Sequence, residues 1–305
     1  MSDSAKFWIE EYQIDGFRHD ATKHIPTPYW TTLTKKLRDQ TNKDFIFQIG
    51  ETFGSRELIR SYVGTDKLDG QFDFNLYFDM RSIFAIQDEP LTKLASSLNE
   101  SLKYYGHHSL MGNITGNHDL PRFITLASGA LRFDEDDKEA GWNRDIQVED
   151  TLGYYRLLQV TSFINTIPGI PVIYYGDEIG MPGAGDPDNR RMMKFDYLTD
   201  HEKWVKENTS KIIKLRRRNL EFIYGDIVIL HSDDESMVYA RKYFNEMSIV
   251  AFNKSLEAKE ITLDLPLFMQ HQNWKINFNN SVIINENNQL VINLKPVSFE
   301  ILTNN

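Results

Sequence analysis

Apolar residues along the first two thirds of the chain fall into two kinds of pattern. Short continuous runs of strand length, at 45–50 and 172–176, each end in glycine, whereas 31–40, 91–105 and 151–165 have the spacing of helices. Strands that alternate with helices predict βα units and a parallel sheet. Polar clusters follow the strand runs, which is where βα barrels carry their active sites. We therefore expect an α/β domain whose functional residues lie just after its strands.

The pattern changes after Gly225, beyond which the sequence has no glycine. Short alternating apolar runs separated by Asn-rich turns are typical of an all-β unit, and we expect a small sandwich. The helix before it is expected to begin at a capping box of Thr199 and Glu202 and to end in the basic run 216–218, where cations oppose the helix dipole. The predicted domains are residues 1–222 and 223–305. The expected strands of the sandwich are 237–239, 248–252, 260–265, 290–294 and 299–302.

Composition and charge exclude several functional classes. The 305 residues include 34 Lys and Arg against 44 Asp and Glu, a net charge of −10, which argues against a nucleic-acid partner. No stretch reaches the ~18 apolar residues that a membrane span requires, so we expect no span. The absence of cysteine rules out disulfides, a thiolate zinc site and a cysteine nucleophile. No signal peptide is visible at the start of the sequence, and the localisation stays unknown.

The first candidate chemical site contains Arg18 and Asp20, just after Gly16 and Phe17. Residues i and i+2 of an extended segment share a face, so the guanidinium and the carboxylate point the same way. A neighbouring guanidinium favours the ionised carboxylate, which is the form that a nucleophile requires. A purely structural Arg–Asp pair at a strand end is an equally good interpretation of this motif alone.

Two further acidic sites also follow apolar runs. Glu51 comes directly after the run 45–49, beside Phe53, and a partly desolvated carboxyl tends to stay protonated as a general acid does. A loop glutamate or a helix-capping acid is the plainer alternative. The cluster Asn117, His118 and Asp119 contains an amide, an imidazole and a carboxylate, although an Asx turn explains it equally. Its spacing does not match a metal site.

The acidic motifs are weak signals singly and a specific signal together. Two carboxylates on neighbouring strands can flank a glycosidic bond, and retention of configuration requires them to be about 5–5.5 Å apart. A serine hydrolase is disfavoured because no Gly-x-Ser-x-Gly elbow occurs, and the glycines at 183–185 match no phosphate-binding fingerprint. Aromatic pairs such as 104–105, 154–155 and 174–175 fit either core packing or sugar stacking.

At this point the chain resembles the α-amylase family, glycoside hydrolase family 13. Residues 16–24 resemble the family's second conserved region, Gly50 and Glu51 the third, residues 117–119 the fourth, and 169–178 the segment along the eighth barrel strand. The all-β tail resembles the family's C-terminal domain. The resemblance implies a role for each residue of the motifs. Asp20 is then the nucleophile, Glu51 the acid/base and Asp119 the stabiliser of the distorted sugar, Arg18 orients Asp20, Asn117 and His118 contact the sugar, and Lys23 and His24 line the leaving-group side.

The family's first conserved region, Asp-x-x-x-Asn-His, does not occur in the sequence. We therefore expect a partial (β/α)₈ TIM barrel of about the fourth to eighth βα units, followed by the sandwich. Such an open barrel leaves two strand edges exposed, which predicts a complementary N-terminal half as a partner, or self-association. For a complete enzyme the resemblance implies calcium and makes export plausible, but for this chain no metal ligand is assigned and no cofactor is certain.

The function expected from these observations is retaining cleavage of α-1,4-glucosidic bonds in starch, maltodextrin or a related α-glucan. A transglycosylase of the same family is a near alternative, because the difference lies in substrate loops and water access. A non-catalytic glucan-binding chain is the alternative from a different class. The three carboxylates favour catalysis, whereas the missing barrel strands favour binding alone.

Overall fold

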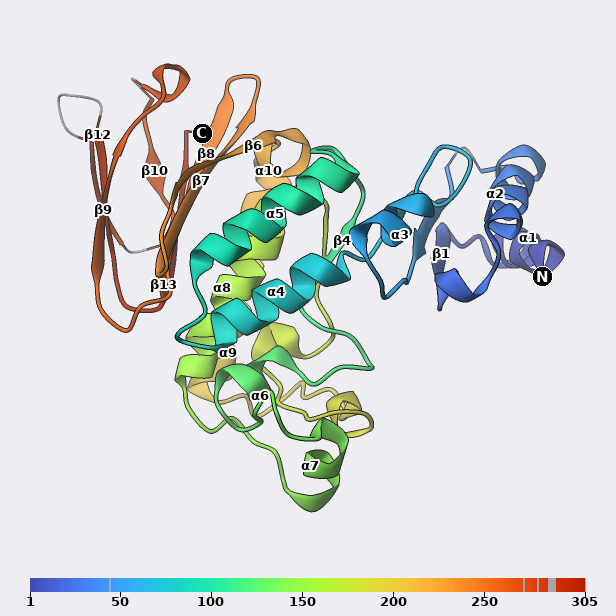
Figure 1. Ribbon diagram of the computed structural model, residues 1–305, viewed down its shortest axis with the longest axis horizontal. Helices are drawn as coiled ribbons and strands as arrows, with labels where there is room; N and C mark the ends of the chain where they lie inside the picture. Colours follow the sequence, from blue (N-terminus) through green and yellow to red (C-terminus); the bar gives the residue numbers. More distant parts are fainter. Residues whose placement is uncertain (44, 271, 279, 285–288, 305) are drawn as a thin grey trace.

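The computed structural model describes residues 1–43, 45–270, 272–278, 280–284 and 289–304. An α/β part with its helices occupies the centre and right of Figure 1, and an antiparallel β unit lies at its left. The fold is thus a partial barrel followed by a small all-β domain, as the sequence predicts. The predicted boundary between residues 222 and 223 stays a prediction, since the short helix α10 (Glu221–Tyr224) spans it.

Among the described residues of the α/β part, five short strands run parallel to one another. β1 pairs with β2, β2 with β3, and β4 with β5, while a bridge between Phe72 and Gly112 links the two groups. The strands therefore form one arc in chain order. In the described part of the chain, the outer edges of β1 and β5 pair with no other strand. The strands are β1 (Gly16–His19), β2 (Phe47–Gly50), β3 (Gly70–Gln71), β4 (Gly112–Ile114) and β5 (Ile170–Val172).

Helices connect the strands, and their limits follow local sequence signals. Asp73 caps α4 by accepting from the Leu76 amide at 3.1 Å, and the predicted capping box of Thr199 and Glu202 opens α9. Among the described residues, no helix combines the length and the apolar character that a membrane span needs. The helices are α1 (Ser2–Tyr12), α2 (Thr27–Gln40), α3 (Arg56–Ser61), α4 (Phe74–Ala85), α5 (Leu91–Tyr105), α6 (Phe123–Ala127), α7 (Asp137–Asn143), α8 (Leu152–Thr166) and α9 (Asp200–Arg218). Short 3₁₀ turns are η1 (Thr22–His24), η2 (Asp177–Ile179), η3 (Asp188–Arg190) and η4 (Leu267–Met269).

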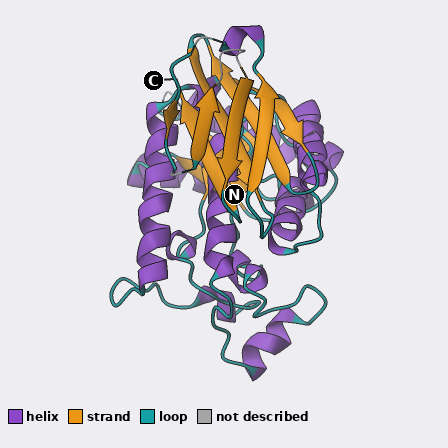
Figure 2. Cartoon of the chain, turned by 90° about the vertical axis from the view of Figure 1, so that its left-hand side faces the viewer, coloured by secondary structure: helices purple, strands orange, loops and turns teal. Residues whose placement is uncertain are grey.

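The C-terminal unit is the predicted sandwich of two antiparallel sheets. Its strands dominate the view in Figure 2. All five predicted strands are present, and β6, β10 and β11 are additional. One sheet runs in the order β10 (Lys275–Ile276), β13 (Ser298–Thr303), β8 (Glu246–Asn253), β7 (Ser236–Tyr243) and β6 (Asp226–Ser232), and the other in the order β11 (Ser281–Ile284), β12 (Gln289–Leu294) and β9 (Lys259–Asp264).

One large core joins α4, α5, α6, α8 and α9 to the adjoining sheet of the sandwich. The N-terminal helices have a separate core around Ile9, Trp30 and Leu37. This N-terminal lobe extends to the right of the main body in Figure 1. The strand ends that carry Asp20 and Glu51 therefore belong to the lobe with the smaller core.

Arg216 has a larger role than the basic end of a helix. Its side chain is buried and Nη1 donates to the carbonyls of Asn165 and Phe222, both at 2.8 Å. Burial lowers its pKa to about 10. Arg217 and Arg218 are exposed, so only they match the predicted position of cations at a helix end. Arg216 instead ties the end of α8 to α10, the short helix that precedes the sandwich.

Candidate active site

The parallel pairing of β1 and β2 sets Asp20 and Glu51 side by side. His19 is the register partner of Gly50, so each acid comes directly after a paired strand end. The Glu51 amide donates to the His19 carbonyl at 2.9 Å, and the Thr22 amide donates to the Glu51 carbonyl at 2.8 Å. The two segments therefore stay hydrogen-bonded beyond the strands, which fixes the backbone beneath both carboxyl groups.

Arg18 bridges the two carboxyl groups. Its Nη1 donates to Asp20 Oδ1 at 2.5 Å, and its Nη2 lies 2.5 Å from Glu51 Oε2. Arg18 and Asp20 therefore share a face of the extended segment, as their spacing predicts. Because the guanidinium is planar and its donors are fixed, this contact restricts the orientation of both acids.

The surroundings of the two acids shift their pKa values in opposite directions. The Asp20 side chain is 73% exposed, and its hydrogen bonds, with Arg18 first and Glu51 next, lower its pKa. The Glu51 side chain is 6% exposed, and burial raises its pKa although the charge of Arg18 opposes this. The site thus holds the pKa of Asp20 below its ordinary value and that of Glu51 above it.

The third predicted cluster follows β4. The Asn117 side chain accepts from the Asp119 amide at 3.0 Å, which is the Asx turn considered above. His118 Nε2 lies 3.4 Å from Asp119 Oδ2. The charge of Asp119 contributes to the raised pKa of Glu51, and the charge of His118 contributes to the lowered pKa of Asp20. The three strand ends therefore place these groups within electrostatic reach of one another.

A cavity of about 180 Å³ lies among these strand ends. Four of the predicted site residues line it, namely Arg18, Glu51, Asn117 and His118. Asp20 and Asp119 are not among the lining residues, but each contacts one of them: Asp20 contacts Arg18, and Asp119 contacts His118. The rest of the lining consists of Phe72, Ile114, Gly116, Val172, Ile173, Tyr174 and Tyr175.

Lys23 and His24 lie outside the described cavity lining, and their side chains are exposed in the turn η1. Lys23 Nζ donates to the Phe53 carbonyl at 2.9 Å, two residues beyond Glu51. This contact places the ammonium on the Glu51 side of the site. The predicted leaving-group role of these two residues stays a prediction.

From the sequence alone, the tyrosine pair of this cavity fits either core packing or sugar stacking. Tyr174 and Tyr175 lie in the lining with their ring centroids 4.6 and 4.8 Å from the Arg122 guanidinium carbon. Arg122 is buried, and its Nη1 lies 3.0 Å from Asp177 Oδ1. The position of the tyrosines at the end of a strand run was the signal for a site role. The guanidinium of the buried Arg122–Asp177 pair packs against both tyrosine rings. No pattern in the sequence indicated this pair.

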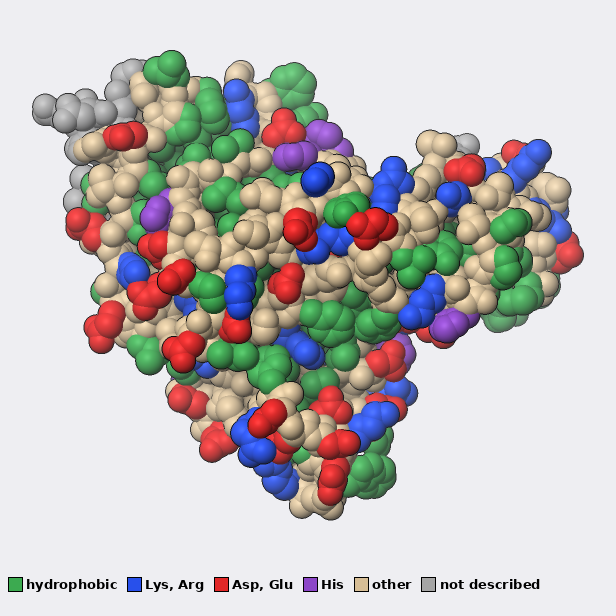
Figure 3. Space-filling view, viewed as in Figure 1, with side chains coloured by type: hydrophobic (Ala, Val, Ile, Leu, Met, Phe, Trp, Pro, Cys, Tyr) green, Lys and Arg blue, Asp and Glu red, His purple; other side chains and the backbone are tan. Residues whose placement is uncertain are grey.

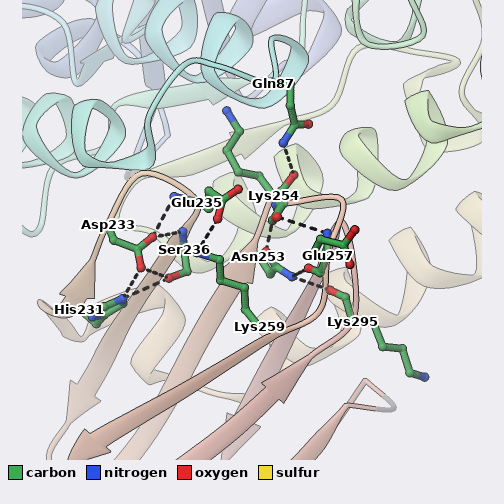
Figure 4. Close-up of polar contacts among 11 residues, drawn as sticks. Gln87, His231, Asp233, Glu235, Ser236, Asn253, Lys254, Glu257, Lys259 and Lys295 are labelled. Atoms are coloured by element: carbon green, nitrogen blue, oxygen red, sulfur yellow. Dashed lines mark hydrogen bonds and ion pairs between the residues drawn. The ribbon is translucent and has the colours of Figure 1, made fainter.

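A Ser–His–Asp cluster occurs in the sandwich, drawn in Figure 4. His231 Nε2 lies 3.2 Å from Asp233 Oδ2 and 3.1 Å from Ser236 Oγ. A catalytic triad needs one imidazole nitrogen for the acid and the other for the nucleophile. Here the same nitrogen faces both groups, so the cluster does not form a nucleophilic triad.

In the part of the chain that the structure describes, no group of three or more His, Asp or Glu side chains could hold a metal ion. Backbone and amide oxygens can also bind calcium. The calcium that the family resemblance implies for a complete enzyme is therefore given no ligands and no chemical step in this chain.

Two family models match the chain. The catalytic domain of alpha amylase matches residues 1–218, and the alpha-amylase C-terminal domain matches residues 225–302. The chain therefore belongs to the α-amylase family, as the four motifs indicate.

Individual relatives add detail. Cyclomaltodextrinase from Geobacillus thermopakistaniensis (strain MAS1) is 28% identical over 269 residues, covering 87% of this chain and 41% of the relative. Cyclomaltodextrin glucanotransferase from Paenibacillus macerans is 29% identical over 259 residues, covering 84% and 32%. The crystal structure of α-amylase from Geobacillus thermoleovorans complexed with acarbose matches with a TM-score of 0.82 and 29% identity, covering 99% of this chain and 62% of that chain. The chain thus spans less than half the length of these two curated relatives.

Proposed function

We propose that the chain carries the catalytic carboxylates of a retaining enzyme that cleaves α-1,4-glucosidic bonds in maltodextrins and related α-glucans. The observation that carries this proposal is the Arg18 bridge between an acid of lowered pKa and an acid of raised pKa, beside the cavity that Arg18 and Glu51 line. A retaining mechanism requires this division, with one carboxylate ionised as nucleophile and one carboxyl protonated as acid.

In the first step Asp20 attacks the anomeric carbon, and a bond forms between that carbon and a carboxylate oxygen. The bond to the glycosidic oxygen breaks, and Glu51 transfers its proton to that oxygen as the leaving sugar departs. In the second step Glu51, now ionised, takes a proton from water. The resulting hydroxyl attacks the same carbon and releases Asp20. Asp119 and His118 hold sugar hydroxyls, and Tyr174 and Tyr175 provide apolar faces for the ring.

Hydrolysis and transfer differ only in the acceptor of the second step. The relatives include a cyclomaltodextrinase and a cyclomaltodextrin glucanotransferase at similar identity. Both outcomes therefore agree with the same carboxyl pair, and the proposed reaction class covers water or a sugar hydroxyl as acceptor.

The test is a product analysis with the purified chain and maltoheptaose. We expect new reducing ends, products with the α-configuration, and loss of turnover in both Asp20→Asn and Glu51→Gln. Glu57→Gln is the matched control, because Glu57 is an exposed acid on α3 that hydrogen-bonds Tyr104 outside the cavity. Products of inverted configuration, or full activity in Asp20→Asn, would contradict the proposal.

A non-catalytic glucan-binding role is the second candidate. The unpaired outer edges of β1 and β5 in the described structure favour it, since a closed barrel normally holds its site residues rigidly. Binding of maltoheptaose without any turnover of the wild-type chain would select this candidate over the enzyme.

A further inference from the structure

A second cavity, built by other elements than the active-site cavity, lies where α8 and α9 meet the segment between β12 and β13. Its volume is about 300 Å³, larger than the cavity of about 180 Å³ beside Glu51. Tyr155 comes from α8, Trp204 from α9 and Ser298 from the start of β13. The two cavities share no lining residue. We call this second one the Tyr155 cavity.

Two aromatic rings form one wall of the Tyr155 cavity. The centroids of Tyr155 and Trp204 are 4.7 Å apart with an interplanar angle of 48°. Tyr155 is 40% exposed, although residues 157–166 that follow on α8 are all buried. Its neighbour Tyr154 is buried and stacks on His201. Core packing thus accounts for Tyr154, whereas the Tyr155 ring is available to a ligand.

Hydrogen-bonding groups lie beside these rings. Asn208 Nδ2 donates to the Trp204 carbonyl at 2.8 Å, which fixes the amide one turn beyond the indole. Ser298 Oγ donates to the Lys295 carbonyl at 2.7 Å, and its oxygen can still accept. Figure 4 shows the Lys295 side chain directed away from the Asn253 network to which its carbonyl belongs. Aromatic faces bordered by amide, hydroxyl and ammonium groups match the alternating C–H faces and hydroxyls of a sugar.

Lys211 and Lys295 are the charged residues in the described lining of the Tyr155 cavity, which is therefore positively charged. None of its described lining residues is acidic. Lys211 is already engaged, because Nζ donates to the Asn277 carbonyl and lies 4.3 Å from the Phe278 centroid. The net charge of −10 over the whole chain disfavours a polyanion. Figure 3 shows acidic and basic side chains interspersed over one face of the molecule, so that face presents no broad basic field.

We propose that the Tyr155 cavity is a second, non-catalytic binding site for an α-glucan chain. The choice of an α-glucan as the sugar rests on the proposed function of the carboxyl site. A glucan held in the Tyr155 cavity does not contact the catalytic carboxyls. The site therefore increases the amount of long glucan bound by the protein without taking part in bond cleavage.

The test measures maltoheptaose binding by isothermal titration in a Glu51→Gln background, which prevents turnover. We expect Tyr155→Ala to weaken one binding event by about tenfold or more, and Tyr155→Phe to retain it, because the phenyl ring preserves the stacking face. Trp142→Ala is the matched control, since Trp142 is 75% exposed on α7 and does not line the cavity. Melting curves confirm that each variant folds.

The outcomes separate this site from the carboxyl site. Unchanged binding in Tyr155→Ala, or equal weakening in Trp142→Ala, would overturn the second site. Loss of maltoheptaose binding in Tyr155→Ala supports the second site, whether or not the wild type cleaves this sugar. Absence of wild-type turnover overturns only the proposed enzyme activity. Cleavage of maltotriose should be the same in Tyr155→Ala and in the wild type.

Discussion

Arg18 Nη2 lies 2.5 Å from Glu51 Oε2, so the acid of raised pKa has a cation in direct contact. The same guanidinium is the largest cause of the lowered pKa of Asp20. Arg18 therefore lowers the pKa of both carboxyls, while burial keeps that of Glu51 above its ordinary value. The difference between the two acids arises from burial and not from the arginine alone.

Replacing Arg18 by methionine should shift the pH dependence of activity. Without the guanidinium the pKa of both carboxyls rises. The acid limb of the pH profile reports ionisation of Asp20, and the alkaline limb reports loss of the Glu51 proton. Both limbs therefore move to higher pH. We expect kcat/KM to fall by about a hundredfold as Asp20 loses its orientation. A pH profile with a maltooligosaccharide measures both effects. Arg132→Met, which removes an exposed arginine paired with Asp134, is the control. Limbs that stay in place would argue against the bridge.

Replacing Glu51 by glutamine should affect substrates according to their leaving group. General-acid catalysis contributes about 10²–10⁴-fold, and a sugar hydroxyl needs that proton, whereas an aryl leaving group of low pKa departs without it. We expect cleavage of maltoheptaose to fall by that factor and formation of the glucosyl-enzyme from an activated aryl maltoside to fall much less. Burst-phase kinetics separate the two steps. Equal losses with both substrates would exclude Glu51 as the acid.

The buried pair of Arg122 and Asp177 predicts a pH-dependent stability. Burial raises the pKa of Asp177 to about 6 against the opposing effects of Arg122 and Thr115. Between its ordinary value of 3.8 and about 6, the folded state binds more protons than the unfolded state. The free energy of unfolding therefore falls as pH rises through this window, by at most ~1.4 kcal/mol per pH unit, and this contribution is constant above it.

Asp177→Asn should remove this slope and also lower stability, because Arg122 stays buried without its carboxylate. Urea unfolding at a series of pH values from 4 to 7 measures the difference from the wild type. Asp200→Asn, at the fully exposed first position of α9, provides the control. A wild type and an Asp177→Asn variant with parallel pH profiles would contradict the assigned direction.

The motifs were predictable from the sequence because each acid lies shortly after a parallel strand: Asp20 after β1, Glu51 after β2 and Asp119 five residues beyond β4. The pairing of β1 with β2 then places Asp20 beside Glu51, which strand order alone implies. The support of Tyr174 by Arg122 was not predictable, since it joins segments 52 residues apart without a local pattern. Arg216 was assigned to the helix dipole because no local pattern indicates its partners: the Asn165 carbonyl is 51 residues away, and the Phe222 carbonyl belongs to the next helix, α10.

Lys254 shows how the sandwich is attached to the helices, and its replacement by methionine should weaken that attachment. Its ammonium donates to the carbonyl of Ile83 in the last turn of α4 at 2.7 Å, to that of Ile86 just after α4 at 2.8 Å, and to that of Glu89 in the connection to α5. Lys254 is buried, and burial lowers its pKa to about 8. The variant removes the ammonium from all three carbonyls and leaves that of Ile86 only the Glu89 amide at 3.3 Å, and we expect a loss of about 3 kcal/mol in the free energy of unfolding.

Lys259→Met is the control for this measurement, and both lysines appear in Figure 4. Lys259 pairs with Glu235 at 2.5 Å between Nζ and Oε2, and its side chain is 27% exposed. A partly exposed ion pair contributes about 1 kcal/mol or less, so its loss should be small. Denaturant unfolding of the two variants tests the contrast. Because the three carbonyls surround a buried ammonium, equal stability of the two variants would show that solvent or a rearranged side chain satisfies them, and the attachment would then depend on the apolar core instead.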